Sequence, residues 1–237
     1  MIDLQNTRIN TAGAYVCIDG LYLFAIGIKP HNSHIPIVRL GGHREGQETG
    51  WQCALREVYE EANLHIQPLV PQTTYVSNWD HKEIELREVQ WQNSIEQEPT
   101  PILVVTYCRQ EGTHLSLMYL SHAEEIPRPS SEVRGLVFLK AEEIHRLCQE
   151  PMTLEQYLRG GGKAILNAEF DTSLVLEPFA QLCLLSKILI MQSKKDVQTR
   201  IVKGNTPLKD GHLCCLYEIY LMRRGVNPGV GSFWNSP

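Results

Sequence analysis

The chain has 237 residues and a formal net charge of −5, with 43% hydrophobic and 21% charged residues. These values are ordinary for a globular protein that buries a sizeable core. The acidic balance argues against a general nucleic-acid or membrane-surface binder, because such proteins carry an excess of basic residues. It leaves open a small anionic substrate held through a metal ion.

Cysteine usage and terminal composition indicate the compartment. Seven cysteines are present, none in a C-x-x-C pair, and Cys214 and Cys215 are adjacent. We therefore expect free buried thiols rather than a disulfide framework or a zinc site. Residues 1–16 do not resemble a signal peptide, and the most apolar later stretch, residues 182–191, is too short to cross a bilayer. These features predict a cytoplasmic protein with no membrane partner.

The first elements predicted along the chain are strands. Residues 13–28 are rich in aromatic and β-branched residues around Asp19-Gly20, a dipeptide that is typical of a tight hairpin turn. Residues 35–40 predict a further strand, which leads the chain to Gly41 and Gly42.

A helix with defined ends is expected next. Thr49 and Gln52 fit a capping box, in which each side chain accepts a hydrogen bond from the backbone N–H of the other residue. Asn63 suits the left-handed position that ends a helix. The apolar residues of this segment share one face of a helical wheel, namely Trp51, Ala54, Leu55, Val58 and Ala62.

Strands and short helices alternate beyond this helix. An edge strand is expected within residues 82–92, two strands around a Glu111-Gly112 turn within 102–120, a strand over 133–140 and a helix over 141–149. From Pro151 onward helices are predicted over residues 153–162, 177–195 (with Pro178 in the first turn) and 210–225. The pattern indicates a mixed-sheet α/β domain over residues 1–150, with a helical C-terminal extension over 151–237 packed on it.

Three glutamates, Glu57, Glu60 and Glu61, lie beside the apolar face of the predicted helix rather than opposite it. Like charges at this spacing repel one another by a few tenths of a kcal/mol per pair, and more where water is excluded. A divalent cation reverses this penalty, and Mg²⁺ prefers oxygen ligands. Upstream, Gly41 and Gly42 let the backbone approach a ligand closely. The cluster therefore predicts a Mg²⁺ site.

These residues form a spaced motif. Glu48 could pair with Arg56 and clamp the preceding loop onto the helix. The segment resembles the Nudix box of the MutT-related hydrolases through Gly42, Glu48, Arg56-Glu57-Val58, Glu60-Glu61 and Asn63-Leu64. Asn63 stands where the family has glycine, and because asparagine also tolerates the left-handed conformation we expect the turn to persist.

The resemblance implies a fold, an activity and a ligand set. It implies an α/β/α sandwich around a mixed sheet, and hydrolysis of a nucleoside diphosphate linked to another moiety. Divalent metal would neutralise the pyrophosphate and activate water. Carried over to this chain, the metal ligands for Mg²⁺ or Mn²⁺ are Glu57, Glu60, Glu61 and the carbonyl of Gly41, with Gly42, Glu48 and Arg56 as supporting residues.

The general base is left open among several carboxylates. Glu57 or Glu60 could accept the proton of the attacking water. Some family members place the base in a distant loop, and Glu132, just before a predicted strand, could be an accessory ligand or base. Glu124 and Glu125 are weaker candidates, and each of these loop acids could equally be a solvated side chain.

Substrate contacts are the least specified part of the motif. His43 and Arg44 lie in the box segment and Arg128 in a later loop, so each could contact phosphate. Trp79, with His81 nearby, could stack a base. The proline or tyrosine found beyond the box in some subfamilies is absent, and so the moiety linked to the diphosphate is not assigned.

Two other classes of protein remain as alternatives. The first is a Nudix-fold sensor that binds such a ligand without cleaving it. Retention of all three glutamates and the net charge of −5 count against that reading. The second is a scaffolding protein that uses its helical extension as an interface, and the apolar stretch between Leu182 and Ile190 could also form a homodimer.

Overall fold

The computed structural model describes residues 8–27, 34–79, 85–91, 98–109 and 112–202, with the side chains of 196–202 left aside. In chain order the elements are β1 (Arg8–Ile18), β2 (Leu21–Ile26), β3 (His34–Val38), β4 (Leu40–His43), α1 (Gly50–Ala62), β5 (Gln67–Pro68), β6 (Thr74–Asn78), β7 (Arg87–Val89), β8 (Leu103–Arg109), β9 (Gly112–His122), β10 (Gly135–Leu139), α2 (Ala141–Leu147), α3 (Leu154–Arg159), β11 (Lys163–Leu166), β12 (Val175–Pro178) and α4 (Ala180–Val202).

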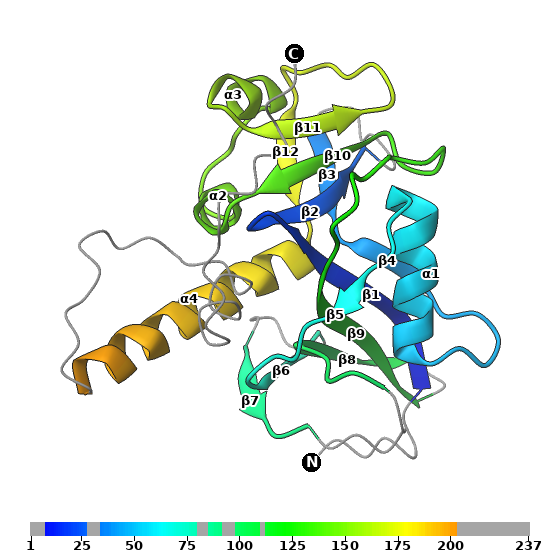
Figure 1. Cartoon of the computed structure of the whole chain (residues 1–237), viewed down its shortest axis with the longest axis vertical. Coiled ribbons are helices and arrows are strands. Elements are labelled where there is room, and N and C mark those ends of the chain that lie inside the picture. Colours follow the sequence, from blue (N-terminus) through cyan, green and yellow to red (C-terminus); the bar gives the residue numbers. More distant parts are fainter. Residues whose placement is uncertain (1–7, 28–33, 80–84, 92–97, 110–111, 203–237) are drawn as a thin grey trace.

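The strands of these ranges join one mixed sheet with the order β11-β10-β2-β1-β9-β8-β6-β7 (Figure 1). The long strands β1 and β9 are parallel neighbours at its centre, while β4 pairs with β1 and β3 pairs with both β2 and β12. Strand β7 ends the order, as expected for the edge strand predicted within residues 82–92. The pairing of β4 with β1 fixes the position of Gly41 and Gly42, which belong to a strand rather than to a loop.

Strand β1 separates two hydrophobic layers because its side chains alternate between the faces of the sheet. Tyr15 and Cys17 join the cluster on the side of α2 and α4, whereas Ala14 and Val16 join the cluster that contains Val58 of α1. Figure 1 shows α1 on one side of the sheet and α2 with α4 on the other. The predicted α/β/α sandwich with a mixed sheet is therefore confirmed.

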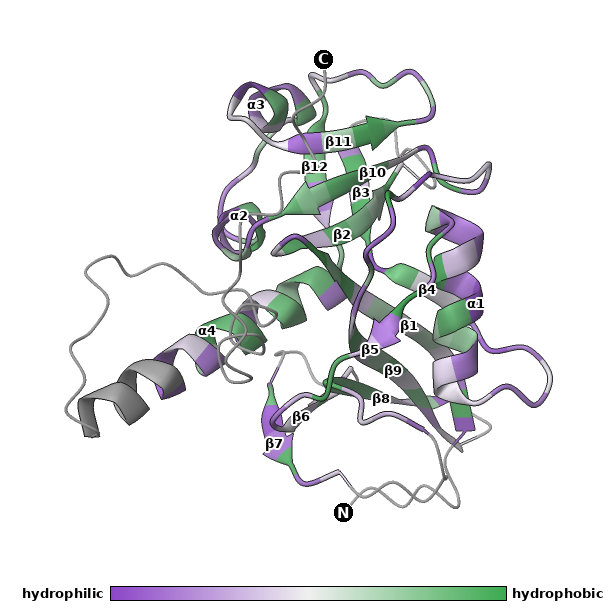
Figure 2. Cartoon of the chain, in the orientation of Figure 1, coloured by the Kyte–Doolittle hydropathy of each residue, from purple (hydrophilic) through white to green (hydrophobic). Residues whose placement is uncertain are grey.

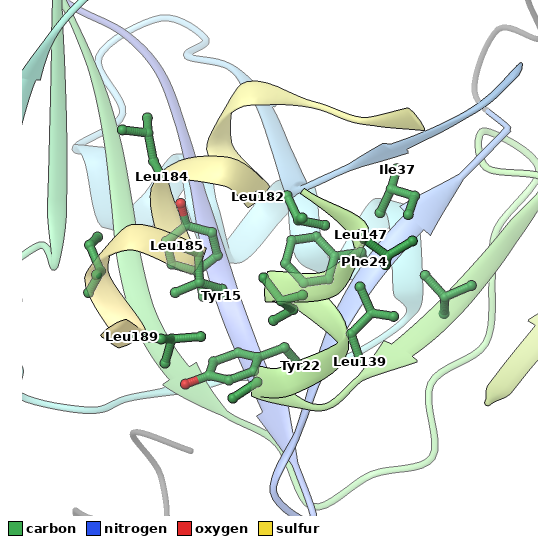
Figure 3. Close-up of a cluster of buried hydrophobic side chains, with 14 of the residues drawn as sticks. Tyr15, Tyr22, Phe24, Ile37, Leu139, Leu147, Leu182, Leu184, Leu185 and Leu189 are labelled. Atoms are coloured by element: carbon green, nitrogen blue, oxygen red, sulfur yellow. The ribbon is translucent and has the colours of Figure 1, made fainter. Parts of the chain in front are cut away.

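Helix α4 contributes much of the larger layer. Figure 3 shows its leucines, including Leu182, Leu185 and Leu189, against Tyr15 and Phe24 of the sheet. Full burial of one such leucine stabilises the fold by about 1.5–3 kcal/mol. Figure 2 shows how hydropathy is distributed: hydrophobic residues follow the central strands and the first part of α4, and hydrophilic residues lie on α1 and β7.

The local turns follow the sequence closely. Asp19 and Gly20 both adopt positive φ, at 49° and 79°, in the two-residue turn that joins β1 to β2. This geometry suits the right-handed twist of the flanking strands. At the start of α1, Gln52 N–H donates to the Thr49 hydroxyl at 3.2 Å and Thr49 N–H donates to Gln52 Oε1 at 2.8 Å. The predicted hairpin and capping box are both present.

Asn63 ends α1 in the left-handed conformation, with φ 57° and ψ 41°, and its N–H donates to the carbonyl of Tyr59. We expect Asn63→Gly to leave the free energy of unfolding nearly unchanged, because glycine adopts this conformation without strain. Asn63→Ala should lower it by about 1 kcal/mol, since alanine carries a Cβ without a compensating polar group. Urea unfolding of the three proteins measures both, and equal stability of the alanine and glycine variants would contradict this account.

The segment after residue 150 differs from its prediction at two places. The helix expected from Glu177 begins instead at Ala180, and Val175–Pro178 form β12, which runs parallel to β3. Strand β11 pairs with β10 and was also not predicted. Strands of four residues are too short for a clear alternation of apolar and polar residues, so their pairing partners determine whether they form. The helix predicted over 210–225 lies outside the described residues, and a domain boundary at residue 150 stays a prediction.

None of the helices in the described part of the chain is both long and apolar enough to span a membrane.

Candidate functional site

Arg56 of α1 is the centre of a network of charged side chains. Its Nε and Nη2 donate to the two carboxylate oxygens of Glu48 at 2.8 and 3.1 Å. Its Nη1 donates to Glu57 at 3.0 Å and to Glu60 at 2.8 Å. Nη2 also donates to the carbonyl of His43 at 2.9 Å. One guanidinium thus joins two glutamates of the helix to the strand and loop that precede it.

The Glu48 carboxylate fixes the loop between β4 and α1. It accepts a hydrogen bond from the N–H of Glu45 at 2.9 Å in addition to the pair with Arg56. The hydrogen bond from Arg56 lowers the pKa of Glu48, and the same contact raises the pKa of Arg56. Both groups therefore stay ionised, and the expected clamp of the loop onto the helix is present.

Glu61 lies on the inner side of α1 and is only 7% exposed. Its Oε2 accepts a hydrogen bond from Gly41 N–H at 2.8 Å. Burial raises the pKa of Glu61 to about 8, although the Gly41 N–H and the charge of Arg39 oppose that rise. The carboxylate is held at the backbone of β4 in a place where its negative charge is poorly solvated.

Glu57 occupies the space above the neighbouring glycine. A Cβ built on Gly42 would lie 2.3 Å from Glu57 Oε1 and 2.4 Å from Oε2, which leaves room for glycine alone. Burial raises the pKa of Glu57 despite its bond to Arg56. The carboxylates of Glu57 and Glu61 consequently meet the backbone of consecutive residues of β4.

Arg39, which the sequence did not single out, provides a second cation on the sheet side of the acids. Its Nη1 donates to the carbonyl of Ala12 at 3.3 Å. A Cβ on Gly41 would lie 2.2 Å from this nitrogen, so the arginine crosses the glycine directly. Burial lowers the pKa of Arg39, whereas the charges of Glu61 and Glu57 act to raise it.

The three glutamates differ in their access to solvent. The side chain of Glu60 is 42% exposed, that of Glu57 is 13% exposed, and Glu61 is buried. In the part of the chain that the structure describes, no three histidine, cysteine or acidic side chains already surround a common point as metal ligands would. Glu57 and Glu60 instead share Nη1 of Arg56. Carboxylate and carbonyl oxygens, such as those of Glu57, Glu60, Glu61 and Gly41, are the type of hard donor that Mg²⁺ or Mn²⁺ prefers.

Glu61 leads to a prediction for the pH dependence of stability without metal. Its folded-state pKa of about 8 lies above the ordinary 4.5, so between these values the folded chain holds a proton that the unfolded chain has released. The free energy of unfolding should therefore fall as pH rises from about 4.5 to 8, by on the order of 5 kcal/mol from this group. Urea unfolding in chelator across this range measures the slope. Glu61→Gln should flatten it, and an unchanged slope in that variant would contradict the assignment.

Glu98 anchors the N-terminal end of α1 and was not predicted either. Its Oε1 accepts hydrogen bonds from Trp51 N–H at 2.8 Å and from the hydroxyl of Tyr119. The rings of Trp51 and Tyr119 pack edge to face at 5.2 Å. A Cβ on Gly50 would lie 2.4 Å from the Tyr119 hydroxyl, so this end of the helix sits directly on β9.

Removal of this anchor should weaken the fold. We expect Glu98→Ala to lower the free energy of unfolding by about 2 kcal/mol, because two donors lose their acceptor where water has poor access. Tyr119→Phe is the matched variant. It keeps the bond from Trp51 to Glu98 and should cost about half as much. Urea unfolding measures both, and wild-type stability in Glu98→Ala would refute the anchoring role.

The loop before β10 is attached to the other end of α1. Arg128 N–H donates to the carbonyl of Ala62 at 2.8 Å, and Ser130 N–H donates to the carbonyl of Glu61 at 3.1 Å. This attachment brings Glu132 close enough that its charge contributes to the raised pKa of Glu61. Arg128 is exposed. The charge of Glu132 thus acts on one carboxylate of the box, and its role as accessory ligand or base stays a prediction.

The two weaker loop acids lie at the far end of this loop. Glu125 accepts a hydrogen bond from His65 N–H at 2.9 Å and contacts the His65 ring at 3.2 Å. Hydrogen bonds from His65 lower the pKa of Glu125. Glu124 is exposed to solvent. Glu125 is thus directed to His65 just after α1.

The substrate candidates are distributed over two parts of the sheet. His43 is exposed at the end of β4, and Arg44 Nη2 donates to the carbonyl of Gly46 at 3.0 Å while its buried Nε has no partner among the described groups. Trp79 is 49% exposed after β6, which is separated from β1 by β9 and β8. His81 lies outside the described residues. His43 and Arg44 thus adjoin the box, whereas Trp79 follows a distant strand.

Comparison with known proteins gives structural similarity at low identity. No family model and no curated protein matches the sequence. A Nudix-family hydrolase from Clostridium perfringens is 17% identical, with 58% of this chain and 83% of that chain covered and a TM-score of 0.38. The MutT protein from Methanosarcina mazei is 16% identical, with 62% and 86% covered and a TM-score of 0.38. A C. elegans Ap4A hydrolase is 18% identical, with 56% and 81% covered and a TM-score of 0.34. The chain thus resembles Nudix hydrolases of known structure.

Proposed function

We propose that the protein is a metal-dependent hydrolase of the Nudix type, which cleaves a pyrophosphate linkage in a nucleoside diphosphate joined to another moiety. The observation that carries this proposal is the convergence of Glu57 and Glu61 on the backbone of Gly41 and Gly42. The Arg56 network supports it, since it unites the spaced residues of the box in one place. A merely solvated helix face would not direct two carboxylates inward.

The metal would be held by Glu57, Glu60, Glu61 and the carbonyl of Gly41. When bound, Mg²⁺ or Mn²⁺ supplies positive charge that offsets the pyrophosphate and promotes ionisation of an attacking water. The donor set is compatible with either ion because all its members are oxygens. Glu48 and Arg56 would hold the loop and the helix at the spacing that this coordination needs.

Proton transfer would fall to a carboxylate near the attacking water. Burial raises the pKa of Glu57, which brings this group toward the range where a general base works well at neutral pH. Glu60 is the more exposed alternative, and Glu132 the candidate from the neighbouring loop. The substrate's phosphates would meet His43, Arg44 or Arg128, of which the first two adjoin the box and the third lies in the loop attached to α1. Trp79 remains a weaker candidate for base stacking.

The chemistry implies the partners. The substrate would be a small anionic nucleotide-type compound, with no nucleic-acid or membrane partner, and the protein would act in the cytoplasm. A homodimer through the apolar face of α4 remains an expectation. The five leucine and isoleucine residues of this helix that the structure describes as buried already belong to the core of the same chain. They are Leu182, Leu184, Leu185, Ile188 and Leu189.

A substrate panel tests the proposal. Purified protein with Mg²⁺ is incubated with nucleoside triphosphates, nucleotide sugars, dinucleotides and capped RNA, and phosphate-containing products are measured. We expect turnover of at least one class and its loss in Glu60→Gln. If wild type and variant were equally inert while one compound still bound tightly, the protein would be a ligand sensor rather than a hydrolase. Chelator with excess Mg²⁺ added back controls for metal dependence.

A further inference from the structure

Two cysteines lie side by side where α2 packs against α4. The helices contact each other through His145 and Ser186, whose Nδ1 and Oγ are 3.2 Å apart. Cys148 caps the C-terminal end of α2, three residues after His145, and Cys183 is three residues before Ser186 in α4. Ser186 also hydrogen bonds to Cys148, so Cys148 lies beside the same part of α4 as His145. The thiols of Cys148 and Cys183 are indeed hydrogen bonded to each other.

The helices that carry these thiols are held by the core. Leu147 precedes Cys148, Leu182 and Leu184 flank Cys183, and all three leucines belong to the cluster in Figure 3. Both cysteines are themselves half-buried and free. Packed flanking residues limit relative movement of the helices, so the two sulfur atoms remain neighbours while small reagents still have access.

The environment separates the two thiols chemically. The hydrogen bond from Cys148 lowers the pKa of Cys183, and the charge of Lys187, one turn further along α4, acts in the same direction. The same hydrogen bond raises the pKa of Cys148. Cys183 is therefore the nucleophilic member of the pair, and Cys148 supplies the second sulfur.

We propose that Cys148 and Cys183 are a reversible oxidation site at which a disulfide joins α2 to α4. With hydrogen peroxide as oxidant, the Cys183 thiolate attacks one oxygen, so that an S–O bond forms as the O–O bond breaks and hydroxide leaves. The Cys148 sulfur then displaces hydroxide from the sulfenic acid and forms the S–S bond. Two thiols and one peroxide yield one disulfide and two waters, and a thiol reductant reverses the result.

The disulfide would close a loop that contains α3, β11 and β12. Closing a loop of this length removes conformations from the unfolded chain, and we expect the melting temperature to rise on the order of 5 °C on oxidation. The start of α4 also receives the hydrogen bond from Tyr15, whose hydroxyl donates to the carbonyl of Gln181 at 2.7 Å. Oxidation would thus fix the position of α4 on the central strand.

The test uses the full chain without metal or substrate, so it is independent of the proposed function. Reduced protein is treated with hydrogen peroxide, unreacted thiols are blocked, and non-reduced peptides are mapped by mass spectrometry. We expect a Cys148–Cys183 peptide that disappears on reduction, together with the rise in melting temperature. Cys148→Ser should instead accumulate a sulfenic acid on Cys183 that a dimedone probe captures, and Cys108→Ser, which removes an exposed thiol, should behave like wild type.

Other outcomes would overturn the proposal. Oxidation of Cys183 directly to sulfinic acid in the wild type would show that Cys148 does not reach it. Linkage of either cysteine to Cys214 or Cys215 would show a different pairing. An unchanged peptide map at peroxide concentrations that oxidise Cys108 would show that the pair does not react.

Discussion

Glu57→Gln is expected to lower the turnover of a cleaved substrate by about 10³-fold, within the range for loss of a catalytic carboxylate. The amide has nearly the same shape as the carboxylate, so glutamine still fits above position 42, where only glycine leaves room for this side chain. It carries no negative charge, however, and it weakens both the contact with Arg56 and the affinity for divalent metal. Stability should change little, because burial already disfavours the charged form of Glu57.

Three measurements distinguish loss of charge from loss of structure. Steady-state kinetics gives the change in turnover, calorimetric titration with Mg²⁺ gives the change in metal affinity, and circular dichroism verifies the fold. Glu142→Gln, in the first turn of α2, is the matched control and should retain wild-type values of all three. Wild-type turnover in Glu57→Gln would remove this residue from both roles proposed for it.

Arg56→Lys should be the most damaging conservative substitution in the box. Arg56 makes a bidentate pair with Glu48 and also contacts Glu57, Glu60 and the carbonyl of His43. Lysine offers one compact ammonium group and cannot satisfy these acceptors from a fixed plane. The side chain is 22% exposed, so solvent screens the pairs only in part. We expect the free energy of unfolding to fall by about 2 kcal/mol and metal affinity to fall as well.

Urea unfolding and Mg²⁺ titration test this expectation. Arg159→Lys is the control, because Arg159 pairs with Glu155 one helical turn away and its side chain is 78% exposed. Exposed pairs of this kind contribute little, and the control should unfold like wild type. Equal stability of both variants would mean that the Arg56 network positions the box without stabilising the fold.

The features that were predicted correctly are those that a few neighbouring residues determine. The Asp19-Gly20 turn, the Thr49 cap with Gln52 and the Asn63 helix end each depend on two or three positions. Backbone conformation at such positions is decided by steric limits and by local hydrogen bonds. The spacing of Glu48 and Arg56 could be interpreted for the same reason, since Glu48 directly precedes the helix cap and Arg56 lies within the first two helical turns.

The features that were missed depend on residues distant in the sequence. Glu98 reaches Trp51 across 47 positions, and Arg39 becomes a half-buried cation only because β4 pairs with β1 above Gly13. Strand β12 forms because β3 offers a free edge to it. No local periodicity encodes these partners, and short strands take the conformation that their neighbours impose.

Strand β1 connects two distant parts of the molecule within three residues. Arg39 lies against Gly13. Two residues further along the same strand, the hydroxyl of Tyr15 donates a hydrogen bond to the first turn of α4. In an extended strand Gly13 and Tyr15 point to the same face of the sheet, whereas Ala14 faces the other layer. Deletion of one residue here would turn each following side chain of the strand to the opposite face of the sheet. The spacing of Gly13 and Tyr15 along β1 therefore fixes two positions together, namely that of Arg39 beside the acids of α1 and that of the first turn of α4.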